Sequence, residues 1–468
     1  MPDDAPRYRL GPRSTRGLIA GWRSGQIASV AAGAVVGLGL LRSIGGLLGA
    51  AMAFLSAGMG IAVATWPIGG RPVESWAPVV VRYARASMAE GGGLPWLAGR
   101  SGSVARARRS PLRFLDLRTL EQAGGSMAVI EDRELSTWSA VVPVSGEGFA
   151  LLDDEQQAEA IAAWSSVLAA VAADSGSLRR LQWIARTRPC LPPNSAPAPA
   201  EYDRVVVDLR QAMWLREAYV VVTTDSPRAG FPLRHSRRRG ELAAESVAIE
   251  RIAALVSSLC DRLAGIGLGV AAPLDAAGLA RMIRASYELD PAGSAGAGWP
   301  WPVGTEASWS AFRTEASWHA TYWVSEWPRG DVGPAVLLPL LIGGLQRRTV
   351  AVVMAPLPAL SAVKRAERER TAGAADAELR SRHGFSLTAR ARVEQDLRLQ
   401  REAELASGHG AYLFSGYVSV AAADEAGLET ACHDLEQAAA QAQLEVRRLF
   451  GSQEEAWCCT LPSGRGCG

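Results

Sequence analysis

Two long apolar runs near the N-terminus dominate the hydrophobic pattern of the chain. Between residues 24 and 70 the only charged residue is Arg42. The runs 25–41 and 44–66, of about 17 and about 23 residues, would span roughly 26 and 35 Å as helices, close to the ~30 Å hydrocarbon core of a bilayer. A tight turn at Arg42 and Ser43 would join them. The pattern therefore predicts a transmembrane helical hairpin.

Aromatic and basic residues flank this hairpin. Trp22 and Trp66 stand at its outer ends, where indole rings favour the headgroup level. Arginines precede and follow it, among them Arg23 and Arg71, whereas the turn carries only Arg42. Because short loops rich in arginine stay on the cytosolic side, we expect a cell-membrane protein with two spans and both termini cytosolic. The alternative is that the first run is a re-entrant or interfacial helix.

Small residues recur at four-residue spacing along both runs. Gly33 and Gly37 belong to the first run, and Gly45 and Gly49 to the second. Such spacing lets two membrane helices approach each other closely. The pattern favours direct packing between the two helices of the hairpin.

Two groups of arginines follow the hairpin. The first lies in a basic, glycine-rich segment and includes Arg106, Arg108 and Arg109. These side chains could lie against anionic lipid of the inner leaflet, at roughly 1 kcal/mol per arginine, or belong to a solvated linker. Both this group and a second basic group are candidates for contact with lipid or with a protein partner. The members of the second group are Arg237, Arg238 and Arg239.

Beyond residue 125, short apolar strands alternate with helices of 3.6-residue periodicity. Strands are predicted at 135–145 and 217–224, for example, and a helix from Asp153 to about residue 174. The glycine-rich segment 292–298 marks a boundary, after which the alternation repeats. The closing β-α-β run 412–450 fits half of a ferredoxin-like split βαβ unit. The expected fold class is α+β, with a transmembrane hairpin and a cytosolic part made of ferredoxin-like units.

These patterns predict five segments. Within the first α/β domain a helix is also predicted over 203–215. Within the second, Gly373 is expected to interrupt a long charged helical arm. The segments are a basic cytosolic N-tail (1–23), the hairpin (24–68), a basic juxtamembrane linker (69–125), a first α/β domain (126–291) and a second α/β domain (299–468) with a long charged helical arm (361–407).

The sequence shows no residue pattern typical of a catalytic site. Lys364 is the only lysine and has no glycine-rich context, so the sequence contains no P-loop, which needs a lysine for the nucleotide phosphates. The six cysteines lack paired C-x-x-C motifs, and reduced thiols are expected in the cytosol. We therefore predict no catalytic residue, cofactor or metal site, and no enzyme. A net charge of +2 gives no reason to expect direct nucleic-acid binding.

Several stretches resemble components of type IV secretion systems. The two-span N-terminus resembles the short PrgI-type hairpin component of Gram-positive conjugation machines. The segment 127–189, which begins MAVIEDRELSTWSAVVPVSGEGF, resembles the N-terminal, non-ATPase domain of the secretion ATPase beside that hairpin. So does RRLFGSQEEAWCCTLPSGRG at 447–466. Taken whole, with GPRSTRGLIAGW and FSGYVSVAA, the chain resembles an actinobacterial membrane-protein family related to these components.

The resemblance implies a structural inner-membrane component that anchors and docks a separate secretion ATPase. Membrane lipid and a polytopic channel protein would be further partners, and the chain would be oligomeric within the complex. The nucleotide-binding residues of the ATPase motor have no counterpart in this sequence. Two alternatives stay open: an E-type membrane component of a type VII export system, and a membrane-bound enzyme of unrecognised chemistry.

Tryptophan is unusually frequent, with 15 residues against 8 Tyr and 8 Phe. Trp323 and Trp327 belong to the stretch WHATYWVSEWPR, in the predicted second domain. They either fill the core of that domain or form an exposed aromatic interface, since tryptophan is over-represented at interface hot spots.

Overall fold

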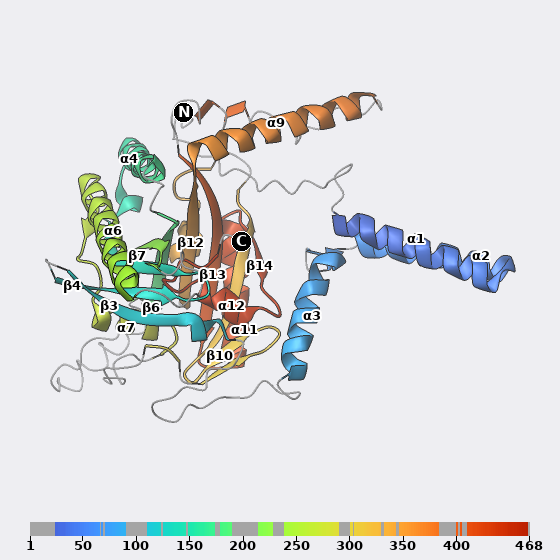
Figure 1. Cartoon of the computed structure of the whole chain (residues 1–468), viewed down its shortest axis with the longest axis horizontal. Helices are drawn as coiled ribbons and strands as arrows, with labels where there is room; N and C mark the ends of the chain where they lie inside the picture. Colours follow the sequence, from blue (N-terminus) through green and yellow to red (C-terminus); the bar gives the residue numbers. More distant parts are fainter. Residues whose placement is uncertain are drawn as a thin grey trace. The chain divides into compact units, whose positions relative to one another are not determined.

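The computed structural model forms two compact units (Figure 1). The N-terminal unit covers residues 12–95, and the second unit, here called the body, is made by residues 1–11 and 96–468. The structure describes residues 24–65, 67–68, 71–89, 110–122, 125–146, 148–173, 178–189, 214–227, 238–289, 300–302, 304–328, 332–342, 346–382, 399–400, 403–404 and 410–466.

The N-terminal unit is a helical hairpin followed by a third helix. Helix α1 (Ser24–Ile44) and helix α2 (Gly46–Thr65) are both long and apolar enough to cross a membrane. A minimal antiparallel ladder of β1 (Pro67–Ile68) and β2 (Arg71–Pro72) leads into α3 (Val73–Ala89). Helix α3 lies in the segment that the sequence pattern presented as a linker.

The reversal between α1 and α2 occurs at two glycines. Gly45 and Gly46 both have φ of +64°, a left-handed conformation that glycine adopts without the steric cost of a Cβ atom. Arg42 and Ser43 belong to the last turn of α1. The prediction that these two residues form the turn is therefore wrong by about one helical turn.

The body is built on one antiparallel sheet with the strand order β3-β4-β5-β7-β6-β12-β13-β11-β10-β9; β8 pairs with β5 and β14 pairs with β11. The expectation of an α+β fold with two apolar N-terminal helices is confirmed. The strands of the first half are β3 (Leu115–Gln122), β4 (Gly125–Asp132), β5 (Thr137–Ser145), β6 (Arg180–Pro189), β7 (Trp214–Asp225) and β8 (Gly269–Val270). Those of the second half are β9 (Thr305–Ala307), β10 (Phe312–Thr314), β11 (Trp318–Glu326), β12 (Arg347–Leu357), β13 (Ala411–Ala422) and β14 (Glu445–Arg448).

The two halves repeat one connectivity. Among the described elements, the first runs β5-α4-β6-β7-α6-β8 and has the strand order β8-β5-β7-β6. The second runs β11-α8-β12-β13-α11-β14, with α9 (Ala359–Arg382) between β12 and β13, and has the order β14-β11-β13-β12. Strands β6 and β12 hold the same place in each half and pair with each other, from Arg348 opposite Thr187 to Met354 opposite Leu181. The segments 126–291 and 299–468 thus contribute to a single sheet.

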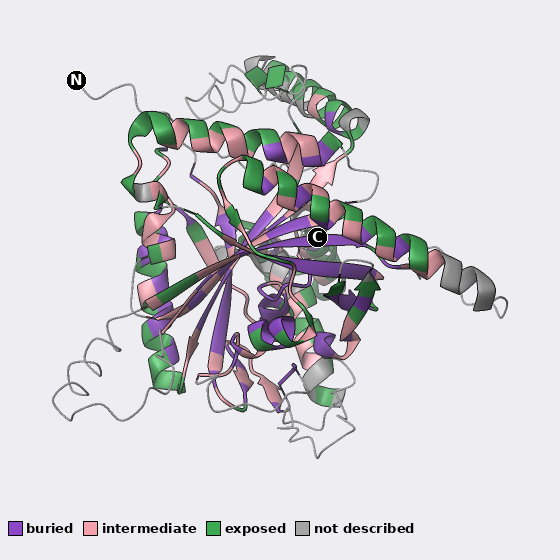
Figure 2. Cartoon of the chain, turned by 90° about the vertical axis from the view of Figure 1, so that its left-hand side faces the viewer, coloured by how far each residue is buried: buried purple, intermediate pink, exposed green. Residues whose placement is uncertain are grey.

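Helices cover both faces of this sheet. The helices α4 (Asp154–Ala173), α6 (Arg238–Gly265), α8 (Leu338–Ile342) and α11 (Glu425–Gln441) pack on one face, where Val142 and Val220 point. The 3-10 turn η1 (Pro111–Phe114), α7 (Ala276–Arg284) and α12 (Gln453–Cys458) pack on the other. The core on this second face runs from Val141 in β5 to Phe312 in β10, so it belongs to both halves. Figure 2 shows the buried residues concentrated in the strands.

Most predicted elements of the body are present, with two exceptions. Trp214 and Leu215, placed at the end of a predicted helix, begin β7 instead; the rest of that prediction lies outside the described residues. Helix α9 (Ala359–Arg382), inserted between β12 and β13, continues through Gly373. The expected break at Gly373 is wrong because one glycine in a helix costs only about 1 kcal/mol relative to alanine.

Candidate functional site

The two helices of the hairpin touch at glycines. A Cβ atom at Gly33 would lie 2.8 Å from the carbonyl oxygen of Ser56 and 3.0 Å from Cα of Gly60. The Ser56 hydroxyl donates a hydrogen bond of 3.0 Å to the carbonyl oxygen of Gly33. At Gly37 a Cβ would lie 2.9 Å from the carbonyl oxygen of Ala53. Close backbone approach with an interhelical hydroxyl bond is typical of packed membrane helices.

The outward surface of the hairpin is apolar and exposed. Leu47 is 93% exposed and Phe54 is 81% exposed. Of the two most apolar windows, 27–44 and 46–65, only 6% and 17% of the residues are buried. A core helix of a soluble protein would have most of its apolar side chains buried, so this surface is suited to contact with acyl chains.

Most of the residues predicted to contact membrane or partner are not placed. Trp22, Arg23, Trp66, Arg106, Arg108, Arg109 and Arg237 lie outside the described residues. Arg71 lies in β2, and Arg238 and Arg239 begin α6. The described arginines that follow the first basic group belong to the body: Arg113 lies 4.2 Å above the ring of Phe114, and Arg118 in β3 pairs with Glu131 at 2.7 Å.

Trp323 and Trp327 are both half-buried. Trp327 meets the ring of Phe414 edge-on at 5.3 Å and packs against the core beneath α8 and α11. Trp323 lies in β11 between Tyr417 of β13 and Arg447 of β14. The structure therefore gives Trp327 a packing role and does not bring the two indoles into one exposed surface.

The C-terminal segment 453–466, here called the strap, crosses the sheet face that carries α7. Gln182 of β6 fixes it through three hydrogen bonds of 3.0 Å. Its amide nitrogen donates to the carbonyl oxygens of Cys459 and Leu461, and its amide oxygen accepts from the N–H of Gly464. Gln182 is fully buried, so these bonds satisfy a side chain that would otherwise be costly inside a core.

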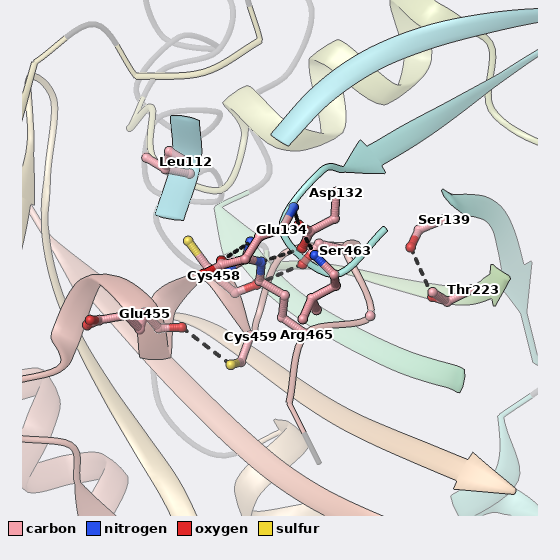
Figure 3. Close-up of polar contacts among 12 residues, drawn as sticks. Leu112, Asp132, Glu134, Ser139, Thr223, Glu455, Cys458, Cys459, Ser463 and Arg465 are labelled. Atoms are coloured by element: carbon pink, nitrogen blue, oxygen red, sulfur yellow. Dashed lines mark hydrogen bonds and ion pairs between the residues drawn. The ribbon is translucent and has the colours of Figure 1, made fainter. Parts of the chain in front are cut away.

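An ion pair holds the end of the strap (Figure 3). Nε of Arg465 lies 2.6 Å from one oxygen of Asp132, and Nη2 lies 2.9 Å from the other and 2.8 Å from Glu134. The Asp132 side chain is 1% exposed and that of Arg465 is 11% exposed. Burial lowers the pKa of Arg465, but its bonds to Asp132 and Glu134 outweigh burial and raise it. The guanidinium of Arg465 therefore makes a bidentate contact between the strap and the end of β4.

A second charge cluster, formed by buried Arg186 and half-buried Glu217 and Arg188, lies on the same sheet face. The guanidinium of Arg186 bonds Glu217 at 2.6 and 3.0 Å and donates to the carbonyl oxygen of Met282 in α7 at 2.7 Å. Arg188 bonds the other oxygen of Glu217 at 2.8 Å. Burial raises the pKa of Glu217, but the two guanidinium groups outweigh it, so the pKa is lowered. This cluster ties β6 and β7 to α7.

The buried imidazole of His319 is held neutral. Burial, with a further contribution from the charge of Arg347, lowers its pKa to about 3. Its Nε2 lies 2.8 Å from the hydroxyl of Ser317, which itself donates to the carbonyl oxygen of Tyr287. The ring packs against Trp457 at 5.5 Å. The neutral ring is 1% exposed and is enclosed within the body.

No metal centre emerges from the part of the chain that the structure describes. Within it, no group of three His, Cys, Asp or Glu side chains could hold a metal ion. The described cysteines Cys260, Cys432, Cys458 and Cys459 are free thiols, and burial raises the pKa of Cys458 well above its ordinary value. Lys364 is exposed on α9.

Sequence patterns did not reveal the strap or its partners. Gln182 and Arg186 lie four residues apart and therefore on the same face of β6. Long polar side chains on one face would normally indicate that this face of the strand is solvated. Their partners in the strap and α7 lie about 100 to 280 residues away along the chain. The one available signal was that long polar side chains alternate within an otherwise apolar strand. Gly60, which approaches Gly33, lies outside the four-residue spacing of Gly45 and Gly49, so the spacing did not indicate it.

No protein-family model matches the sequence, and no curated protein matches it. The fold and the hairpin together define a chain with two N-terminal helices suited to a membrane and a large body of antiparallel sheet and helices.

Proposed function

We propose that the chain is a structural component of the inner membrane in a type IV-like secretion or conjugation apparatus. The hairpin spans the membrane with both termini in the cytosol, and the body docks a separate secretion ATPase beside a polytopic channel protein. The observation that carries this proposal is the exposed apolar surface of α1 and α2, with only 6% and 17% of their most apolar windows buried, joined to the body. The secretion assignment rests on the sequence resemblance.

The connectivity of the body supports the proposed ferredoxin-like architecture. In a ferredoxin-like unit, a β-α-β-β-α-β chain forms an antiparallel sheet in which the first and third strands are central. The strand order supports this arrangement for both halves, because β5 and β7 are central in one and β11 and β13 are central in the other. We infer two such units joined through their second strands, with α9 as an insertion in the second unit.

A docking role without chemistry fits the described polar groups. The strap and the cluster around Glu217 use their charges to bind one chain segment to another, at distances of 2.6–3.0 Å. In each, the charged atoms face protein partners. We propose that the protein is not an enzyme and that force and nucleotide hydrolysis come from the partner ATPase.

Affinity purification from native membranes in a mild detergent tests the proposal. We expect a P-loop ATPase and a polytopic membrane protein to co-purify with the full chain, identified by mass spectrometry. A tagged form limited to residues 1–95 is the matched control, since it keeps the hairpin and lacks residues 96–468 of the docking body. It should lose the ATPase.

Four results would contradict the proposal or redirect it. Absence of any ATPase from the full-chain sample, or equal recovery with residues 1–95, would remove the docking role. Recovery of a type VII export motor would favour the E-type assignment. ATP hydrolysis above background by the purified chain would contradict the structural role.

A further inference from the structure

Helix α3 carries an apolar stripe along one side. Trp76, Val80, Ala84 and Met88 recur every four residues and therefore lie on one face of the helix. Val80 is 47% exposed and Met88 is 80% exposed, and Val81 beside them is 45% exposed. The N-terminal unit thus leaves part of this stripe uncovered.

The opposite side of α3 carries two arginines, together with Pro78 and Val79. At about 100° per residue, Arg82 lies about 180° and Arg85 about 120° from the centre of the stripe. Both arginines are exposed. An apolar stripe with arginines on the other side is the pattern of helices that lie in a membrane interface.

The start of α3 is fixed close to the end of α2. In the ladder of β1 and β2, Pro67 lies opposite Pro72, so the chain turns back on itself directly after α2. Paired residues in such a ladder have Cα atoms about 4.5–5.5 Å apart. The first residue of α3, Val73, therefore lies close to Thr65, the last residue of α2.

We propose that α3 lies flat in the headgroup region of the same membrane that the hairpin crosses, with its apolar stripe toward the acyl chains. This inference rests on the proposed membrane anchoring and extends it to the lipid surface. Arg82 and Arg85 then meet the headgroup phosphates, which makes an anionic bilayer the preferred partner.

Fluorescence depth measurements on the full chain test this proposal. The chain is reconstituted in vesicles of phosphatidylcholine and anionic phosphatidylglycerol, with a polarity-sensitive fluorescent amino acid introduced at a single site. At Met88 we expect a blue-shifted emission that lipids with a spin label high on the acyl chain strongly quench. At Arg82, the matched site on the opposite side, we expect emission typical of water and little quenching.

A probe at Phe54 in α2 distinguishes failure of the membrane-spanning hairpin from failure of the interfacial placement of α3. Quenching at Phe54 by spin labels deep in the acyl chains supports the hairpin, whatever α3 does. Quenching at Phe54 without quenching at Met88 overturns the inference on α3 alone, and a blue-shifted but unquenched Met88 probe shows that protein covers the stripe instead. Absence of lipid quenching at Phe54 would remove the membrane anchoring itself.

Discussion

At the scale of single residues, the body's buried charges serve to connect distant segments. Asp132 is almost fully buried and is paired by Arg465, which lies more than 330 residues later in the chain. Removing one partner of such a pair costs more than the pair contributes, because the remaining charge has no water and no counter-charge. Glu217 differs, because it is paired by both Arg186 and Arg188 and keeps a counter-charge when one of them is removed.

Arg465→Met should destabilise the body strongly. The substitution leaves the Asp132 carboxylate buried without its guanidinium, which costs about 3–5 kcal/mol. Arg179→Met is the matched control, since Arg179 pairs with Asp225 at 2.5 Å while both side chains remain 41% and 55% exposed. The control should cost less than about 1 kcal/mol. Urea unfolding followed by tryptophan fluorescence measures the free energy of unfolding of both variants. Equal losses would show that the buried pair stabilises the body no more than an exposed pair does.

His319 should make stability depend on pH in a defined window. Its pKa is about 3 in the folded chain and near the ordinary 6.5 when unfolded, so the unfolded chain binds more protons between these values. Stability is therefore full above about pH 6.5 and falls as pH decreases toward 3, with a slope of up to about 1.4 kcal/mol per pH unit from this group. His319→Gln should reduce that slope over pH 4–6 in urea titrations. An unchanged slope would show that His319 is accessible to protons.

At the scale of elements, the sequence pattern was most informative where an apolar run or a regular hydrophobic spacing extends over many residues. The hairpin, α4 and the strands β5 and β7 follow directly from apolar runs and their spacing. Helix α3 was missed because its basic and glycine-rich surroundings indicated a linker. The polar pair Arg42 and Ser43 suggested the end of a helix, but α1 accommodates both residues in its last turn. The chain reverses at Gly45 and Gly46 instead.

Glycine at position 33 should matter for the packing of α1 on α2. In Gly33→Ala the new Cβ would meet the Ser56 carbonyl oxygen at 2.8 Å, so the helices must separate, at a cost of about 1–3 kcal/mol. Gly39→Ala is the control, because no atom lies within 4 Å of the added Cβ. Hydrogen–deuterium exchange of α1 and α2 peptides in detergent should accelerate for Gly33→Ala alone. Equal exchange in both variants would contradict the packing.

At the scale of the whole molecule, the body behaves as one unit because its halves share a sheet and a core. Strand order could not be deduced from the sequence, since the pairing of β6 with β12 joins segments about 160 residues apart. Local propensity carries no information on such a pair. The candidate contacts of the strap were hidden for the same reason, and only the polar alternation in β6 hinted at them.

Both halves of the body should therefore unfold together. We expect the urea midpoints measured by hydrogen exchange of β4 peptides and of β13 peptides to coincide, because the core from Val141 to Phe312 is common to both halves. A β13 midpoint clearly below that of β4 would show that the second half unfolds independently.

The topology of the hairpin in intact cells tests the central claim of membrane anchoring most directly. A cysteine at Ser43, which is exposed beside the turn, should react with a membrane-impermeant maleimide added outside the cells. A cysteine at Leu151, which is 90% exposed on the body, should react only after the cells are permeabilised. Labelling of Leu151→Cys in intact cells, or protection of Ser43→Cys from the outside, would contradict a two-span anchor with a cytosolic body.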